Sequence, residues 1–268
     1  MLCPWPQHAG REKNMLLAID IGNTNITIGM FEGERLVMES RLATDRKRTS
    51  DQYAIELMDI LRLNGVQTSD IDGAIISSVV PELTSPIKDG IRKLVPVRPL
   101  VVGPGIKTGL NIKTDNHSQL GADLVAAAVA AIENYRLPCI VFDLGTATTI
   151  SVIDETGSFT GCIIAAGVAT SIDALSSRTA MLPHISIEAP PKVIGTNTPD
   201  CMRSGAVFGA AAMLDGLAER IERELGGKAS LVATGGLARE IIKHCYKKVE
   251  FSDNLLLEGL RIIYDRNR

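Results

Sequence analysis

The sequence predicts an α/β protein of two duplicated domains, each with a mixed β-sheet flanked by helices. Two stretches support this prediction: AIDIGNTNITIGMF at 18–31 and VFDLGTATTISVID at 141–154. Each places an Asp, a Gly and several polar residues, mostly Thr, between two apolar runs, and the copies are offset by about 123 residues, from Asp20 to Asp143. Strand-like and helix-like segments then follow each copy in a comparable order, which indicates an internal duplication.

In the first half, the apolar and β-branched runs 16–21 and 26–31 flank Gly-Asn-Thr-Asn, which predicts a β-hairpin. The residues at 50–64 follow a helical period, with Tyr53, Leu57 and Leu61 on one face. The remaining expected elements of this half are strands at 36–42, 74–80 and 99–102 and helices at 84–94 and 119–134.

The second half restarts the strand pattern after Leu137-Pro138. Its expected elements are strands at 139–144, 149–153, 158–165 and 231–234, and helices at 169–179, 200–225, 239–245 and 254–265. We therefore expect domains at 15–136 and 137–268. Residues 1–14 contain the single Trp and two Pro without periodicity, and we expect them to form a disordered tail.

Composition excludes several classes of protein. The 268 residues are 45% hydrophobic and 22% charged, with a formal net charge of -3, which argues against binding to nucleic acid. We interpret the short basic run Arg46-Lys47-Arg48 as a solvated surface. Five scattered cysteines without a CxxC pair suggest neither a zinc site nor disulfides, which favours the cytoplasm. No apolar run reaches the roughly 18 residues of a membrane helix.

The two polar turns suggest a phosphate site. Asp20 and Asp143 each end a buried apolar run, where a carboxylate is costly unless a cation binds it. Mg²⁺ accompanies nucleotide phosphates, and glycine lets backbone N–H groups approach phosphate oxygens. We therefore expect two hairpins, one per domain, to hold one nucleotide. Ala233-Thr234-Gly235-Gly236 follows a strand and precedes a helix, and the glycine pair is a third expected element of this site.

DIGNTN, DLGTATT and ATGG together resemble the actin, sugar-kinase and heat-shock ATPase superfamily, which implies the actin-like ATPase (ribonuclease H-like) fold. Four further stretches narrow this resemblance to one family within the superfamily: QLGADL at 119–124, IAAGV at 164–168, MLPHISIEAP at 181–190 and IGTNTPDCMRSG at 194–205. From Met15 to about Asp265 the chain resembles the type III pantothenate kinases. The resemblance implies ATP-dependent phosphorylation of pantothenate, the first committed step of coenzyme A synthesis, in the cytoplasm.

The resemblance also implies site residues. Asp123 would be the catalytic base, and Asp143 would hold the potassium or ammonium ion on which the family depends. Asp20 would bind Mg²⁺ through water. The implied ATP ligands are Asp20, Ile21, Gly22, Asn23, Thr24, Asn25, Ile26, Thr27, Thr146, Gly235 and Gly236. The implied pantothenate ligands are Gly121, Ala122, Asp123, Leu124 and Thr198, the last from the partner subunit of a homodimer.

The acceptor motif departs from the family at two positions. The family's usual Gly-Ala-Asp-Arg ends here in Leu124, and Thr114 stands where a Tyr is common. We expect Leu124 to raise the KM for pantothenate, with Lys113 or Arg178 compensating. Two alternatives stay open: a nucleotide-binding accessory regulator, and a kinase of another small alcohol in the same superfamily.

Small residues predict close helix packing at two places. The Ala-rich stretch 125–131 and the run Gly205–Ala212 could each pack against a partner chain or within this chain. From the sequence the two options are equally open.

Overall fold

The computed structural model describes residues 14–117 and 120–268, so the expected tail at 1–14 lies almost entirely outside the described residues. The chain divides into two compact units. The first unit ends at Ile106 and also includes the last two residues, Asn267 and Arg268, and the second unit runs from Lys107 to Arg266. The boundary between the two units therefore lies earlier in the chain than the expected domain boundary at 136/137. The expected helix at 119–134 therefore belongs to the second unit.

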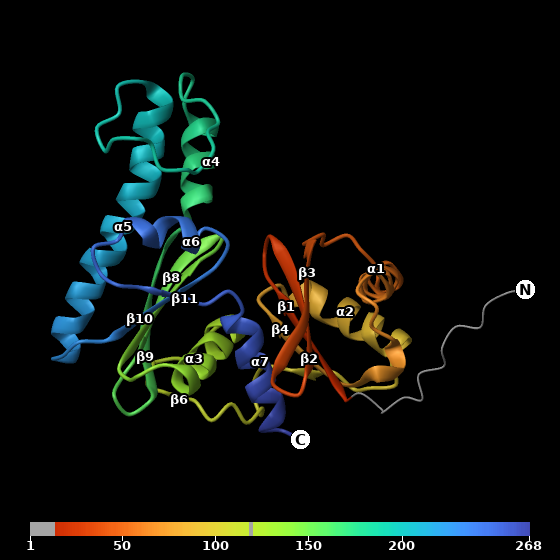
Figure 1. Cartoon of the computed structure of the whole chain (residues 1–268). Helices are drawn as coiled ribbons and strands as arrows, with labels where there is room; N and C mark the ends of the chain where they lie inside the picture. The colour runs from red at the N-terminus through yellow and green to blue at the C-terminus, as the bar shows by residue number, and fades with distance from the viewer. Residues whose placement is uncertain (1–13, 118–119) are drawn as a thin grey trace, which may run out of the picture. The chain divides into compact units, whose positions relative to one another are not determined.

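The first unit is a five-stranded mixed sheet with two main helices (Figure 1). Its strand order is β3-β2-β1-β4-β5, in which β1, β2 and β3 are antiparallel neighbours and β4 and β5 run parallel to β1. The elements are β1 (Met15–Ile21), β2 (Asn25–Glu32), β3 (Arg35–Ala43), α1 (Ser50–Leu63), the 3-10 turn η1 (Thr68–Asp70), β4 (Ile71–Ser78), α2 (Pro81–Leu94) and β5 (Leu100–Val101).

Local sequence explains these elements. Thr49 and Gln52 form a capping box that starts α1, and Tyr53, Leu57 and Leu61 bury its apolar face. α2 begins at Pro81, three residues earlier than expected, because proline suits the first helical position. Gly90 on α2 allows the α1 backbone to approach, since a Cβ there would lie 3.0 Å from the Ser50 carbonyl oxygen.

The second unit is a six-stranded mixed sheet in the order β11-β10-β7-β8-β9-β6. Its strands are β6 (Asn111–Ile112), β7 (Cys139–Leu144), β8 (Ala147–Ile153), β9 (Ser158–Ala166), β10 (Ser230–Thr234) and β11 (Glu250–Phe251). Its helical elements are α3 (Ala122–Asn134), α4 (Val168–Arg178), α5 (Thr198–Leu225), α6 (Ala238–Ile241), the 3-10 turn η3 (Ile242–His244) and α7 (Leu255–Asp265).

The expected duplication is confirmed by strand order and direction. The order β9-β8-β7-β10-β11 repeats β3-β2-β1-β4-β5, with two antiparallel pairs followed by two parallel pairs in both sheets. The strand β6, which is not among the elements expected from the sequence, is an addition at the edge of the second sheet. The mixed sheets with flanking helices confirm the predicted α/β fold.

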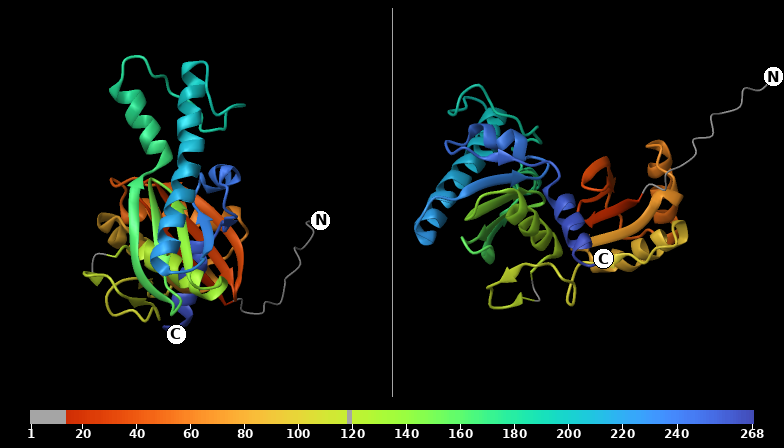
Figure 2. Two further views of the ribbon diagram at one scale, coloured as in Figure 1. Left: turned by 90° about the vertical axis from the view of Figure 1, so that its left-hand side faces the viewer. Right: turned by 60° about the horizontal axis from the view of Figure 1, so that its bottom comes forward.

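In the second unit, helices lie on both faces of the sheet (Figure 1). α3 packs against β7, β8 and α7, and a Cβ on Gly259 of α7 would overlap the Ala126 carbonyl oxygen of α3. All residues from Leu124 to Ala131 are buried, so this Ala-rich helix packs within the chain. α5 and α6 pack on the other face, and α4 and α5 extend past the end of the sheet (Figure 2). In the described ranges no helix is both long and apolar enough to cross a membrane.

Candidate functional site

The first hairpin joins β1 to β2 and presents its polar tip to solvent. Asp20 pairs with Thr27 across the antiparallel ladder and with Ser77 on the parallel neighbour β4, so hydroxyl side chains flank the carboxylate on one sheet face. Asn23, Thr24 and Asn25 are exposed, whereas Ile21 and Ile26 are buried. The two isoleucines therefore anchor the turn in the core, and the polar residues between them lie at the surface.

The segment after β3 fixes this turn. The Gly22 N–H donates to the Asn25 carbonyl oxygen at 3.0 Å, and a Cβ on Gly22 would lie 2.9 Å from that oxygen. The Thr44 hydroxyl donates to the Gly22 carbonyl oxygen at 2.7 Å, and the Thr44 N–H donates to the Thr24 carbonyl oxygen at 2.9 Å. The bond from Gly22 closes the turn, and the two bonds from Thr44 attach it to the segment after β3.

The second hairpin joins β7 to β8 and repeats the same chemistry. Asp143 pairs with Thr149 across the antiparallel ladder and with Thr234 on the parallel neighbour β10. Asp143 thus occupies the position in its sheet that Asp20 occupies in the first sheet. In each case a carboxylate at the turn end of a central strand is flanked by two hydroxyl residues.

Asp123 lies close to this second hairpin. It is the second residue of α3, after the Gly121 N-cap, and its Oδ1 accepts from the Leu124 N–H at 2.8 Å. Burial raises the pKa of Asp123. Burial and the neighbouring Asp123 charge raise the pKa of Asp143 to about 6. Two neighbouring carboxylates that are both partly buried favour a bound cation or proton.

A metal at either hairpin would use few protein carboxylates. Within the described residues no three His, Cys, Asp or Glu side chains converge. Mg²⁺ is commonly held by one or two carboxylates, water and substrate phosphates, so single aspartates at the hairpins fit that ion. The hydroxyl-flanked Asp143, with Asp123 nearby, also fits a monovalent cation.

Two glycines, Gly235 and Gly167, lie directly against the second hairpin. Gly235, at φ +99°, lies against the Asp143 carboxylate, so the predicted glycine pair and the predicted hairpin are neighbours. Gly167 lies against the turn itself, because a Cβ there would overlap the Gly145 and Thr146 carbonyl oxygens. The Thr170 hydroxyl donates to the Thr146 carbonyl oxygen at 2.7 Å. Sequence reading missed Gly167 and Thr170 as parts of this site, although IAAGV contains the first of them.

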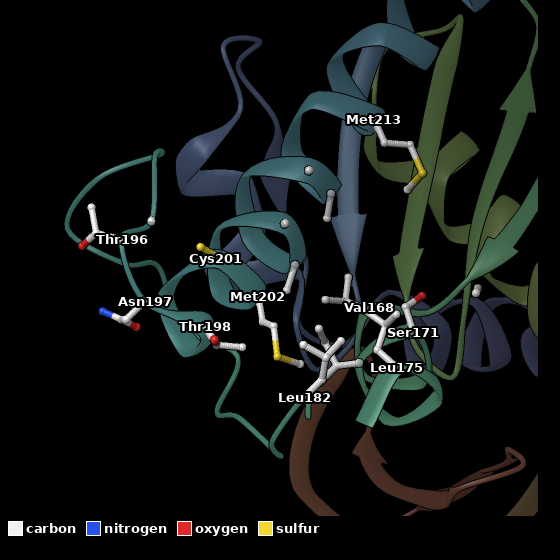
Figure 3. A pocket seen from close by; sticks show the side chains of 17 residues that line it. Val168, Ser171, Leu175, Leu182, Thr196, Asn197, Thr198, Cys201, Met202 and Met213 are labelled. Carbon is white, nitrogen blue, oxygen red and sulfur yellow. The ribbon is translucent and has the colours of Figure 1, made fainter. Parts of the chain in front are cut away.

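The remaining predicted acceptor residues divide into two places. Gly121, Ala122 and Leu124 surround Asp123 at the start of α3, but Leu124 is only 9% exposed and contributes to the core. Thr198 is the first residue of α5 and is exposed. It lines a pocket of about 830 Å³ between α4 and α5, with Val168, Leu175 and Met202 among the other lining side chains (Figure 3). Asp123 is not among the described residues that line this pocket.

The two cations expected to compensate for Leu124 lie on different elements, Lys113 directly after β6 and Arg178 at the end of α4. The Lys113 ammonium lies 2.7 Å from Asp154 Oδ2, where it tethers the strand before α3 to the turn between β8 and β9. The Lys113 side chain is therefore already engaged in an ion pair.

Comparison with known proteins identifies the family. The sequence model described as type III pantothenate kinase matches residues 16–220. A type III pantothenate kinase of Exiguobacterium sp. is 44% identical over 254 residues, covering 95% of this chain and 100% of the relative. This chain belongs to the type III pantothenate kinase family. A second member, from Moorella thermoacetica, is 44% identical over 255 residues, covering 94% of this chain and 100% of its own length.

Solved structures support the fold at lower identity. A Campylobacter jejuni protein, provisionally described as a Baf family transcriptional activator, has a TM-score of 0.58 and 21% identity, with 94% of this chain and 98% of that chain covered. Component A of (R)-2-hydroxyglutaryl-CoA dehydratase from Acidaminococcus fermentans has a TM-score of 0.54 and 15% identity, with 94% and 97% covered. The kinase family member described here thus has the actin-like ATPase and sugar-kinase fold that the sequence predicted.

Proposed function

We propose that this chain transfers the terminal phosphoryl group of ATP to the hydroxyl of pantothenate, giving 4'-phosphopantothenate and ADP, in the cytoplasm. The observation that carries the proposal is the proximity of Asp123 and Asp143 beside the second hairpin, in a chain of this family. Phosphoryl transfer depends mainly on positioning and on stabilisation of charge, and a site of this kind supplies both.

Asp123 is the proposed catalytic base. In the reaction, the acceptor hydroxyl loses its proton to Asp123, its oxygen bonds the terminal phosphorus, and the bond from that phosphorus to the ADP oxygen breaks. The raised pKa of Asp123 supports this role, because a more basic carboxylate takes up a proton more readily. A positioned base typically contributes about 10²–10⁴-fold to the rate.

Asp143 is the proposed ligand of a potassium or ammonium ion. Its carboxylate is flanked by Thr149 and Thr234 and sits near the Asp123 charge. A monovalent cation there would offset the two neighbouring negative charges and stabilise ionised Asp123. We further propose that Asp20 binds Mg²⁺ through water, and that ATP uses both hairpins, 20–27 and Thr146, with Gly235 and Gly236.

The proposed assembly is a homodimer in which Thr198 contacts the pantothenate of the partner subunit. Leu175, which lines the pocket of Figure 3, is an exposed apolar side chain. Met181 and Ile194, which precede the lining residues Leu182 and Gly195 in the sequence, are exposed as well. Four small residues line that pocket, and their short side chains would let another chain approach closely: Gly205, Ala206, Gly209 and Ala210. A second copy of this chain would cover these apolar surfaces.

A kinase for another small alcohol is the second candidate. The observation that favours it is Leu124, whose nearly buried side chain offers no charge to an acid acceptor. Such a kinase would keep the same ATP site and the same base, and it would differ only in the acceptor.

The test measures ADP release from the purified protein with ATP and Mg²⁺. Pantothenate, a panel of sugars and no acceptor are compared, each with and without potassium or ammonium. Turnover that requires pantothenate and rises with the monovalent cation supports the proposal. Turnover with a sugar but not with pantothenate would support the second candidate, and ATP binding without turnover would indicate a regulator.

A further inference from the structure

The first hairpin has a cationic neighbour that sequence reading treated as part of a solvated surface. The Arg46 Nη2 donates to Asn23 Oδ1 at 3.0 Å, at the exposed tip of the turn. Thr44, two residues earlier, is bonded to Gly22 and Thr24 of the same turn. The segment that carries Arg46 is therefore fixed onto the hairpin.

The Arg46 guanidinium retains donors for a ligand. Its other contact is Glu82, whose Oε1 lies 4.0 Å from Nη1, and the two side chains are 56% and 63% exposed. An ion pair this long and this exposed contributes little. A guanidinium has five N–H donors in a planar fork, which suits two oxygens of a phosphate.

The other two basic residues of the run face elsewhere. Arg48 pairs with Asp45 and with Glu56 of α1. Lys47 lines a separate hollow beside α1 together with Arg48 and Glu56. Of the basic run, Arg46 is the member that contacts the hairpin.

We propose that Arg46 is a phosphate-binding residue of this kinase, with Asn23 holding its guanidinium at the tip of the first hairpin so that the fork contacts the terminal phosphates of ATP. The part of this inference that concerns phosphoryl transfer rests on the proposed function. The part that concerns binding of the ATP phosphates by Arg46 does not. The chain has no GxxxxGK[ST] loop to supply a lysine, and Arg46 would supply the missing protein cation. A cation on the transferring phosphoryl group stabilises the charge of the transition state.

The experiment compares Arg46→Gln and Arg46→Lys with Lys47→Gln. The control removes the same charge one residue away, beside α1 rather than at the hairpin. Binding of AMP and of the β,γ-imido analogue of ATP is measured by calorimetry with Mg²⁺, and turnover is measured with pantothenate. Thermal unfolding checks that each variant folds.

We expect Arg46→Gln to weaken binding of the ATP analogue by about tenfold or more, which is the usual scale for a charged hydrogen bond. AMP affinity and the KM for pantothenate should change by less than about twofold, Arg46→Lys should recover part of the loss, and Lys47→Gln should resemble the wild type. Equal effects of Arg46→Gln and Lys47→Gln, or equal loss of AMP and analogue binding, would overturn the assignment. Absence of pantothenate turnover in the wild type would refute the proposed function and leave the binding comparison as the test of Arg46.

Discussion

Gly235 lies directly against the Asp143 carboxylate: a Cβ at position 235 would stand 2.8 Å from Asp143 Oδ1 and 2.7 Å from the Leu144 carbonyl oxygen. Real Cβ atoms do not approach so closely, and the φ of +99° at Gly235 also disfavours any other residue. The strand-to-helix turn after β10 can therefore reach the second hairpin only with glycine at this position.

Gly235→Ala should displace the Asp143 carboxylate and strain the turn. We expect a loss of about 1–3 kcal/mol in the free energy of unfolding, and at least a tenfold loss of affinity for an ATP analogue. Gly227→Ala, after α5 and outside the proposed site, is the control, because a Cβ there meets nothing within 4 Å. Chemical denaturation and calorimetry measure both quantities. Identical behaviour of the two variants would contradict the close packing of Gly235 on Asp143.

Thr170 ties the start of α4 to the turn that carries Thr146. Its hydroxyl donates to the Thr146 carbonyl oxygen at 2.7 Å. Thr170→Val keeps the shape but removes this bond, whose net worth of about 1 kcal/mol corresponds to a roughly fivefold rise in the KM for ATP. The KM for pantothenate should stay unchanged, and Thr170→Ser should restore the wild-type value.

The control for Thr170 lies at the other end of the same helix. The Thr179 hydroxyl donates to the Leu175 carbonyl oxygen at 2.8 Å, so Thr179→Val removes a similar bond away from the hairpin. Steady-state kinetics with both substrates varied separates the two cases. If Thr170→Val and Thr179→Val raise the KM for ATP equally, Thr170 does not position the turn.

Glu222 is a buried carboxylate that ties α5 to the segments around it. It is 8% exposed and accepts from Lys247 Nζ at 2.7 Å and from Lys228 Nζ at 3.0 Å. Burial raises the pKa of Glu222, but the hydrogen bonds from Lys247, Lys228 and the Ala229 N–H outweigh it and hold the pKa below its ordinary value of 4.5. The folded state therefore gains stability from ionised Glu222.

This stability depends on pH with a definite sign. A carboxylate whose pKa is lowered by folding contributes fully above its unfolded pKa, and the contribution is lost as pH falls through the folded pKa. Glu222→Gln should cost about 1–3 kcal/mol at pH 7, and the difference from wild type should shrink below pH 4.5. Urea denaturation from pH 7 to pH 3 measures this, with the exposed Glu224→Gln as control. A difference that stays constant down to pH 3 would contradict the assignment.

The sequence predicted the hairpins and the duplication because both depend on local patterns. Short apolar runs with β-branched residues on either side of Gly-Asn-Thr-Asn predict β1 and β2 without long-range information. The two-residue strands β6 and β11 were missed, since each forms by pairing with a distant strand rather than by its own pattern. The unit boundary also depends on packing: α3 carries no mark in its sequence that assigns it to the second sheet.

The candidate site residues were predicted from the repeated turn, from the glycine pair after a strand, and from resemblance to a family. Asp20 and Asp143 were predicted as site residues because the same turn occurs twice, and Asp123 was predicted from resemblance to a family. Arg46 and Thr170 act through hydrogen bonds to residues more than twenty positions away, and nothing in the local sequence specifies those partners. Arg46 was even assigned to the solvated surface, because a basic run usually has that role.

The most direct measurement is the effect of Asp123→Asn on ADP release with ATP, Mg²⁺, potassium and pantothenate. The substitution keeps the size of the side chain at the start of α3 but removes the proton acceptor. We expect kcat to fall by at least about 10²-fold, with the binding of an ATP analogue and the melting temperature unchanged. A kcat within about threefold of the wild type would contradict the assignment of Asp123 as the base of a pantothenate kinase.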